Sequence, residues 1–154
     1  MAIRRATQKA QVIEKLRASA PAGDTFIACV HGETGPSPWL NALFDQVPLL
    51  GLIVALTRRF YFFTLTDSHV IVNSANRFTN RPGEIIVVFP REAFPASRVK
   101  ITTWWSRFYV QLPGSGRPTR INVSRYWRAE LEGLSAAFPT GELVGQAGAG
   151  VIPA

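Results

Sequence analysis

The feature that most constrains this fold is a run of short β-prone segments, separated by turn residues, from residue 60 to residue 123. Phe60–Leu65 is aromatic, Thr66–Ser68 is a turn, and Val70–Val72 is β-branched, which predicts a hairpin. An earlier alternating segment at Asp24–His31 adds one strand. The later strands are predicted at 84–89, 99–105, 108–112 and 119–123, with turns at 106–107 and 113–118. Seven short strands in this order predict a mainly β domain.

Helical periodicity appears on both sides of the strands. Trp127, Leu131, Leu134 and Phe138 recur at helical spacing, which predicts a closing helix over 125–138 with Ser124 as its N-cap. A second apolar stripe predicts an N-terminal amphipathic helix within residues 1–20, ended by Pro21 and Gly23, and its members are Ile3, Ala6, Ala10, Ile13 and Leu16.

An apolar segment at 39–57 separates the first two predicted strands. Pro48 and Gly51 prevent one straight helix there, so we expect two short helical pieces. Its apolar run, 47–56, has about half of the ~20 residues that a membrane span needs. The run is therefore expected to be either a buried segment or an interfacial one.

Two motifs resemble those of bacterial pleckstrin-homology-like (PH-like) domains. Tyr61–Val72 is similar to their second-to-third strand hairpin, and Trp127–Leu134 is similar to their closing helix. The resemblance covers about residues 24–138, and the 39–57 insertion departs from it. It implies a seven-stranded bent antiparallel barrel capped by a C-terminal helix, and a non-enzymatic binding or scaffold module. The Gly- and Ala-rich segment 139–154 is expected to be a flexible tail.

The charge balance indicates an anionic partner. The 154 residues, enough for one domain, hold 17 basic and 10 acidic side chains, and 14 of the basic ones are arginine. Residues 58–128 carry twelve bases against three acids. The candidates are a protein partner, a second copy of the chain and the anionic inner face of a membrane, with nucleic acid as the alternative. The expected location is cytoplasmic, with peripheral attachment to the inner membrane face as a possibility.

The predicted contact site is the apolar insertion and the arginines near it. The insertion offers more apolar surface than a plugged barrel needs, so we expect self-association or membrane contact there. Arg77 and Arg81, in a predicted polar loop, are candidate anion contacts. Arg58 and Arg59 would be headgroup anchors or, if the insertion packs over the sheet, solvated charges. The contact residues predicted from the sequence are Trp39, Leu43, Phe44, Leu50, Ile53, Arg58 and Arg59.

The aromatic-basic cluster at 104–109 has two interpretations. A hairpin whose alternating faces fill the core is favoured over a base-stacking platform, since the sequence has no RNA-binding motif of the RNP type. Trp104 and Trp105 should point to opposite faces of the sheet.

No catalytic, metal or cofactor site is predicted. His31 and His69 are the only histidines, and neither lies in a recognised catalytic or metal-binding motif, so both are interpreted as structural strand residues. Cys29 is the only cysteine, which excludes an internal disulfide and a cysteine-based zinc site. It is expected to be buried and unreactive.

Overall fold

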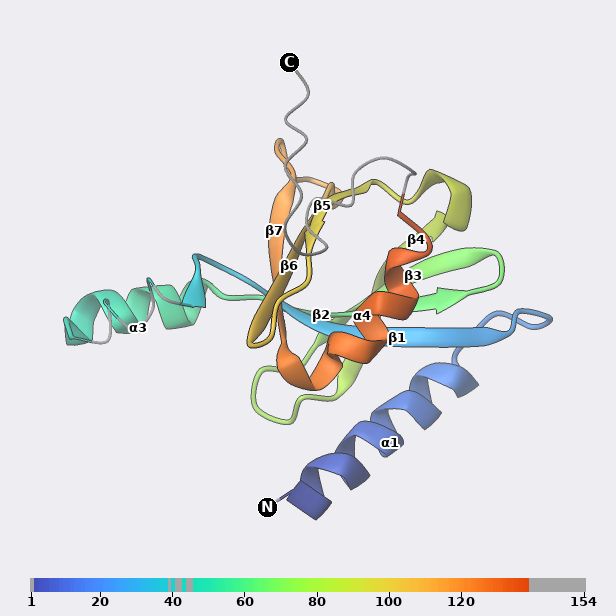
Figure 1. Cartoon of the computed structure of the whole chain (residues 1–154), viewed down its shortest axis with the longest axis horizontal. Helices are drawn as coiled ribbons and strands as arrows, with labels where there is room; N and C mark the ends of the chain where they lie inside the picture. Colours follow the sequence, from blue (N-terminus) through green and yellow to red (C-terminus); the bar gives the residue numbers. More distant parts are fainter. Residues whose placement is uncertain (1, 39, 41–42, 44–45, 139–154) are drawn as a thin grey trace.

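The computed structural model describes residues 2–38, 40, 43 and 46–138 (Figure 1). Its fold is mainly β, with a helix before the strands and another after them, as predicted. The elements, in chain order, are α1 (Ala2–Ala18), β1 (Phe26–Thr34), α3 (Pro48–Thr57), β2 (Phe60–Thr66), β3 (His69–Ala75), β4 (Pro82–Pro90), η1 (Arg91–Ala93), β5 (Ala96–Lys100), β6 (Trp105–Val110), β7 (Thr119–Ser124), η2 (Arg125–Trp127) and α4 (Arg128–Ser135).

The seven strands form one antiparallel sheet in the order β4-β3-β2-β1-β7-β6-β5, which confirms the predicted fold class. β1 joins its two halves, because it pairs with β2 along most of its length and with β7 through Glu33 and Thr34. This junction requires glycine at position 32, where any side chain would collide with Ile121 of β7. β4 and β5 are the edges of the open sheet.

Helix α4 closes the sheet as the sequence predicts (Figure 1). Leu131 and Leu134 are fully buried, and Trp127 is only 8% exposed. Phe138, just beyond the helix, packs against Phe108 with ring centroids 5.5 Å apart. Ser124 occupies the N-cap position, as expected, but its side chain makes no capping hydrogen bond, and the first turn is the 3₁₀ helix η2. A one-turn 3₁₀ start is common at helix ends.

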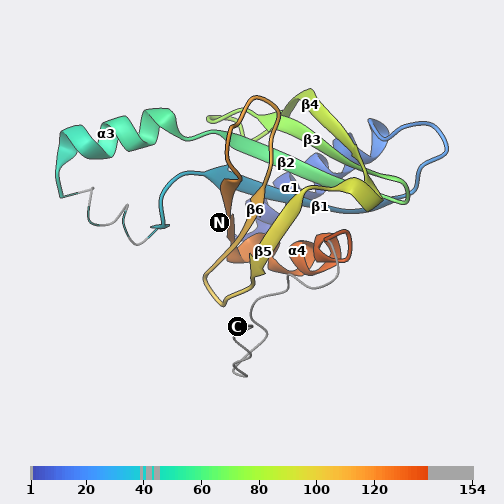
Figure 2. The same cartoon turned by 90° about the horizontal axis from the view of Figure 1, so that it is seen from above.

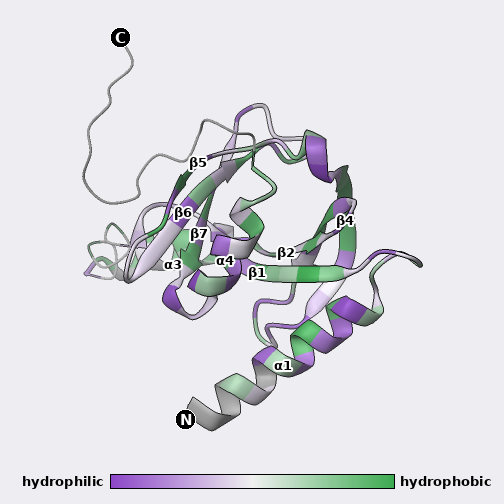
Figure 3. Cartoon of the chain, turned by 45° about the vertical axis from the view of Figure 1, so that its right-hand side comes forward, coloured by the Kyte–Doolittle hydropathy of each residue, from purple (hydrophilic) through white to green (hydrophobic). Residues whose placement is uncertain are grey.

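Helix α1 docks on the sheet through its second half. Val12 and Leu16 are buried, whereas Ala6 and Ala10 of the predicted stripe are exposed. Hydrophobic and hydrophilic positions are interleaved along α1 in Figure 3. Lys9 forms an ion pair with Glu130 of α4 and donates a hydrogen bond of 2.9 Å to the Tyr126 carbonyl. Of the side chains of α1 that the structure describes, only Val12 and Leu16, in the later turns, are buried.

Several strand boundaries differ from the prediction, and two of these differences affect the surfaces described below. β1 runs to Thr34 through part of the expected loop, because pairing with β7 prolongs it. The turn between β5 and β6 lies at 101–104 instead of 106–107, and Ser106 Oγ accepts a 3.1 Å bond from the Thr102 amide there. This shift moves Trp105 into β6.

Candidate functional site

Helix α3 projects from the body of the domain and does not pack over the sheet (Figures 1 and 2). All its residues except Thr57 are apolar or glycine, and none is charged. Leu49 is 69% exposed and Leu56 is 64% exposed, and the exposed surface extends over Leu50, Leu52 and Ile53. No helix among the described residues is long and apolar enough to cross a bilayer. The large apolar side chains of α3 are therefore exposed on a helix too short to span a membrane.

The one polar side chain of α3 is satisfied within the helix. The Thr57 hydroxyl lies 3.1 Å from the Ile53 carbonyl and 3.0 Å from the Val54 carbonyl, to which it can donate. Pro48 begins the helix, so one of the unpaired amide donors of a first turn is missing.

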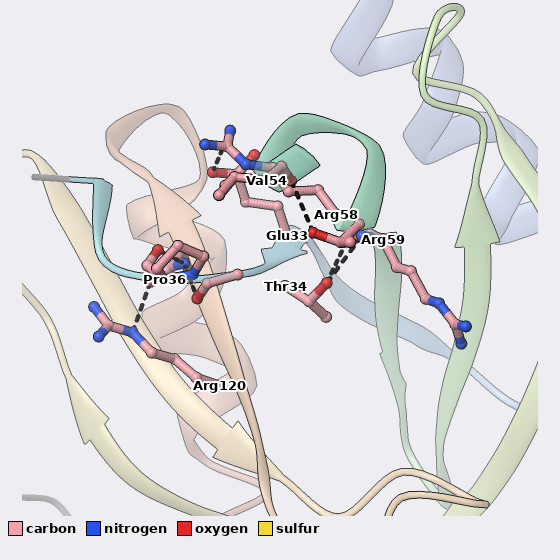
Figure 4. A network of polar contacts seen from close by, with 10 residues as sticks. Glu33, Thr34, Pro36, Val54, Arg58, Arg59 and Arg120 are labelled. Atoms are coloured by element: carbon pink, nitrogen blue, oxygen red, sulfur yellow. Dashed lines mark hydrogen bonds and ion pairs between the residues drawn. The ribbon is translucent and has the colours of Figure 1, made fainter. Parts of the chain in front are cut away.

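Backbone hydrogen bonds fix the two chain segments at the base of α3, as Figure 4 shows. The Thr34 amide donates to the Arg59 carbonyl at 2.8 Å, and the Arg59 amide donates to Thr34 Oγ1 at 2.9 Å. On the other side, Asn122 Nδ2 of β7 donates to the carbonyls of Gly35 and Pro36 at 3.3 and 3.2 Å. These contacts hold both ends of the β1–β2 connection at the rim of the sheet.

Arg58 and Glu33 form a partly buried ion pair at this base, with Nη1 and Oε1 3.9 Å apart. Burial raises the pKa of the Glu33 carboxyl, and the charge of Arg58 opposes that rise. Gly35, at φ +138°, lies against Arg58, whose Cγ would be 3.5 Å from a methyl group at that position. Arg59 is exposed, and no described acidic side chain pairs with it.

The β3–β4 turn presents an aromatic ring between two arginines. Phe78 is 92% exposed, and Arg77 and Arg81 are exposed beside it. Asn76 Oδ1 accepts hydrogen bonds from the amides of Phe78 and Thr79 at 2.9 and 3.0 Å. The turn is therefore ordered, and it holds Phe78 in solvent. The sequence analysis did not single out Phe78; an aromatic residue between two bases in a turn was the available signal.

Strand pairing brings this turn to the same end of the sheet as α3. Phe60, where β2 begins, pairs with Ala75, where β3 ends, and Ala75 pairs with Pro82 of β4. The β1–β2 connection and the β3–β4 turn therefore leave the sheet at one rim. Figure 2 shows α3 extending from this rim. The site consists of α3, the Arg58–Arg59 pair and the turn at 76–81.

Several of the predicted contact residues belong to this site. Leu43, Leu50 and Ile53 are exposed, as an interface requires. Trp39 and Phe44 lie outside the described residues. Arg58 and Arg59 are both at the base of α3, but Arg58 is engaged with Glu33, so Arg59 is the more accessible of the two.

The histidines and the cysteine lie elsewhere. Cys29 is buried, as predicted, and burial raises its pKa to about 12. Burial lowers the pKa of His31 to about 4, and its ring lies 4.9 Å from that of Phe62. Within the described part of the chain, no group of three or more His, Cys, Asp or Glu side chains could hold a metal ion.

His69 has a carboxylate partner that sequence reasoning did not find. Its Nδ1 lies 2.8 Å from Asp24 Oδ2, and this contact, together with the Thr66 hydroxyl, lowers the pKa of Asp24. The Ser68 hydroxyl donates to Asp24 Oδ1 at 3.0 Å, so the geometry ties the β2–β3 turn to the start of β1. This arrangement does not align the serine oxygen with the imidazole as a nucleophile would be.

No protein-family model, curated protein or solved structure matches this chain significantly.

Proposed function

We propose that this protein is a non-catalytic PH-like binding module that docks on an anionic membrane surface by inserting α3. The observation that carries the proposal is the exposure of a ten-residue uncharged helix at the rim of a well-packed sheet. Large exposed apolar surfaces mark sites of contact with a protein or a membrane.

The length of α3 matches a shallow insertion. Ten residues at 1.5 Å per residue give about 15 Å, roughly half of a ~30 Å hydrocarbon core. Full burial of a leucine side chain contributes about 1.5–3 kcal/mol. Leu49, Leu50, Leu52, Ile53 and Leu56 are about half exposed or more, so their insertion contributes on the order of 5 kcal/mol. That is enough for reversible attachment when charges assist.

The charges at the base of α3 favour an anionic surface. Arg59, Arg77 and Arg81 are exposed at the same rim, and a base near an anionic leaflet contributes about 1 kcal/mol. Phe78 adds an aromatic ring beside two of them. Aromatic and arginine side chains together are typical of the membrane-water interface.

Two features favour lipid over a protein partner. A helix that docks on a protein usually keeps a polar face toward water, whereas α3 has no charged side chain on any face. Its one hydroxyl is satisfied by its own backbone, which suits a solvent without hydrogen-bonding groups. Self-association through α3 is the competing outcome.

The test compares Ile53→Asp in α3 with Ile85→Asp on the edge strand β4. The two isoleucines have similar exposure, 49% and 52%, so the control places the same charge on another apolar surface. Co-sedimentation with phosphatidylcholine vesicles containing phosphatidylglycerol should fall at least tenfold for Ile53→Asp and remain for Ile85→Asp. Thermal unfolding of both variants checks that each is folded.

Sedimentation velocity distinguishes the competing outcome. The wild type could be a dimer that Ile53→Asp converts to a monomer. If the wild type also fails to bind vesicles, the partner of α3 is a second copy of the chain and not a membrane. Equal vesicle binding by the wild type and Ile53→Asp would refute the proposal.

A further inference from the structure

A long stretch of the chain carries positive charge only. Residues 93–129 contain seven bases and no acid. This stretch includes β5, β6 and β7, the half of the sheet that lies beyond β1. Among the described residues, Arg128 is the only one of these bases that forms an ion pair, with Glu132 of α4, so the exposed surface of the rest of the segment has a positive potential.

Alternation along β6 divides its side chains between the core and the outer face. Ser106, Phe108 and Val110 are buried, while the alternate residues point outward. The register adds outward residues from the neighbouring strands, because Arg107 pairs with Lys100 on one side and with Asn122 on the other. This outer face is defined by Lys100, Trp104, Trp105, Arg107, Tyr109, Arg120 and Arg125.

Both tryptophans belong to the surface, whereas Ser106 and Phe108 of the same cluster enter the core, as the preferred hairpin interpretation requires. Trp104 is 60% exposed in the β5–β6 turn, and Trp105 is 38% exposed at the start of β6. The position of the turn at 101–104 explains why neither enters the core.

Guanidinium groups lie over the aromatic rings of this face. The Arg125 guanidinium lies 4.8 Å from the centroid of Trp104 and 5.4 Å from that of Tyr126. Arg98 lies 6.0 Å from the centroid of Tyr109. Within the described residues, no base of the outer face forms an ion pair with a carboxylate. Stacking holds the side chains while their N–H groups remain available to an anion.

The outer face is continuous with the base of α3. Arg120 donates through Nε to Asn122 Oδ1 at 2.9 Å, and Asn122 in turn holds the Gly35 and Pro36 carbonyls (Figure 4). In Figures 1 and 2, α3 projects on the side of the body where β5, β6 and β7 lie. A surface reached by α3 would therefore also be close to this face.

We infer that the outer face of β5–β6–β7 binds the phosphate groups of anionic lipids and makes the docking selective for an anionic membrane. The inference rests on the proposed insertion of α3 and adds a second, chemically different contact. Arginine suits this task because its fork of donors matches phosphate oxygens, and tryptophan and tyrosine suit the interfacial depth. Single-stranded nucleic acid offers phosphates too, but it would leave the adjacent apolar helix exposed to water.

The experiment reverses two charges on this face and two elsewhere. The test variant is Lys100→Glu with Arg107→Glu, and the control is Arg17→Glu with Arg91→Glu, on α1 and η1, with the same change in net charge. Binding is measured on vesicles of phosphatidylcholine alone and on vesicles that also contain phosphatidylglycerol, over a salt series. Thermal unfolding verifies the fold of each variant.

The wild type should prefer the anionic vesicles by at least tenfold at low salt. The test variant should lose that preference and much of its salt dependence, while its binding to neutral vesicles stays within twofold. The control should keep most of the preference. A test variant that retains the preference of the control would overturn the inference.

Two further arms separate the possible failures. Ile53→Asp should lose binding to both kinds of vesicle. If it keeps that binding, the proposed insertion of α3 is refuted, whether or not the outer face binds lipid phosphates. A fluorescent single-stranded oligonucleotide should bind the test variant and the control equally well, because the two carry the same net charge. Tight oligonucleotide binding that the test variant loses, with an unchanged lipid preference, would assign the face to nucleic acid and overturn the inference.

Discussion

The two long helices before β2, α1 and α3, are attached to the same sheet in opposite ways. α1 is polar overall, yet Val12 and Leu16 are buried and Lys9 is engaged with Glu130. α3 is the more apolar helix, yet its large side chains face solvent. The mean hydropathy of a helix therefore does not predict which of the two helices packs against the hydrophobic core. Complementary partners on the sheet and on α4 determine it.

The largest expected effect is a difference in the free energy of unfolding between a substitution in α1 and a substitution in α3. Leu16→Ala should lower the free energy of unfolding by about 2–5 kcal/mol, because it leaves a cavity beneath α1. Leu52→Ala in α3 should change it by less than about 0.5 kcal/mol, since an exposed side chain has little packing to lose. Urea denaturation of both variants measures the difference. Equal losses would mean that α3 is packed in solution and would remove the contrast.

Acid should destabilise the packed body through His31. Its pKa is about 4 in the folded protein against about 6.5 when unfolded, so only the unfolded state binds the proton between these values. Stability should therefore fall as the pH drops from about 6.5 to about 4, by on the order of 3 kcal/mol. In His31→Phe this pH dependence should disappear, whereas Leu52→Ala should retain it. Denaturation at pH 7, 5.5 and 4.5 gives the comparison, and an unchanged slope in His31→Phe would show that the ring is accessible to water.

The smallest effect concerns the base of α3. Burial raises the pKa of Glu33 and Arg58 opposes the rise, so Arg58→Met should raise that pKa further. Because the folded protein then binds the Glu33 proton more readily than the unfolded chain, stability from this group increases as the pH falls through the raised pKa. NMR titration of the Glu33 carboxyl in both proteins measures the shift, with Arg59→Met as control. An unchanged pKa would mean that the 3.9 Å pair is not formed in solution.

Sequence periodicity predicted which side chains form the core, but it predicted little about which side chains form the binding surfaces. Burial produces both the helical spacing of Trp127, Leu131 and Leu134 and the alternation of side chains along the strands. Both patterns can therefore be recognised in the sequence alone. The outer face could not be read in this way, because the exposure of Trp104 and Trp105 depends on where a four-residue turn falls. The Asp24–His69 contact joins residues 45 positions apart and has no periodic signal.

The candidate site was predicted in part for a similar reason. A run of leucines such as that in α3 is the same whether it is packed or exposed, so the sequence left a buried and an interfacial segment equally open. Phe78 was missed because a single residue in a turn carries no pattern, although Asn76 holds its backbone in place.

The long connection between β1 and β2 has a consequence for how the chain folds. Residues 35–59 join these strands, whereas two residues join β2 to β3. Loop-closure entropy grows only with the logarithm of length, about 0.6 kcal/mol per doubling, so the extra segment costs the hairpin roughly 2 kcal/mol. The register of β1 against β2 is set by seven cross-strand pairs outside this segment. The connection can therefore change in length and composition while the sheet assembles by the same route, which leaves the exposed helix open to variation independently of the strands that carry it.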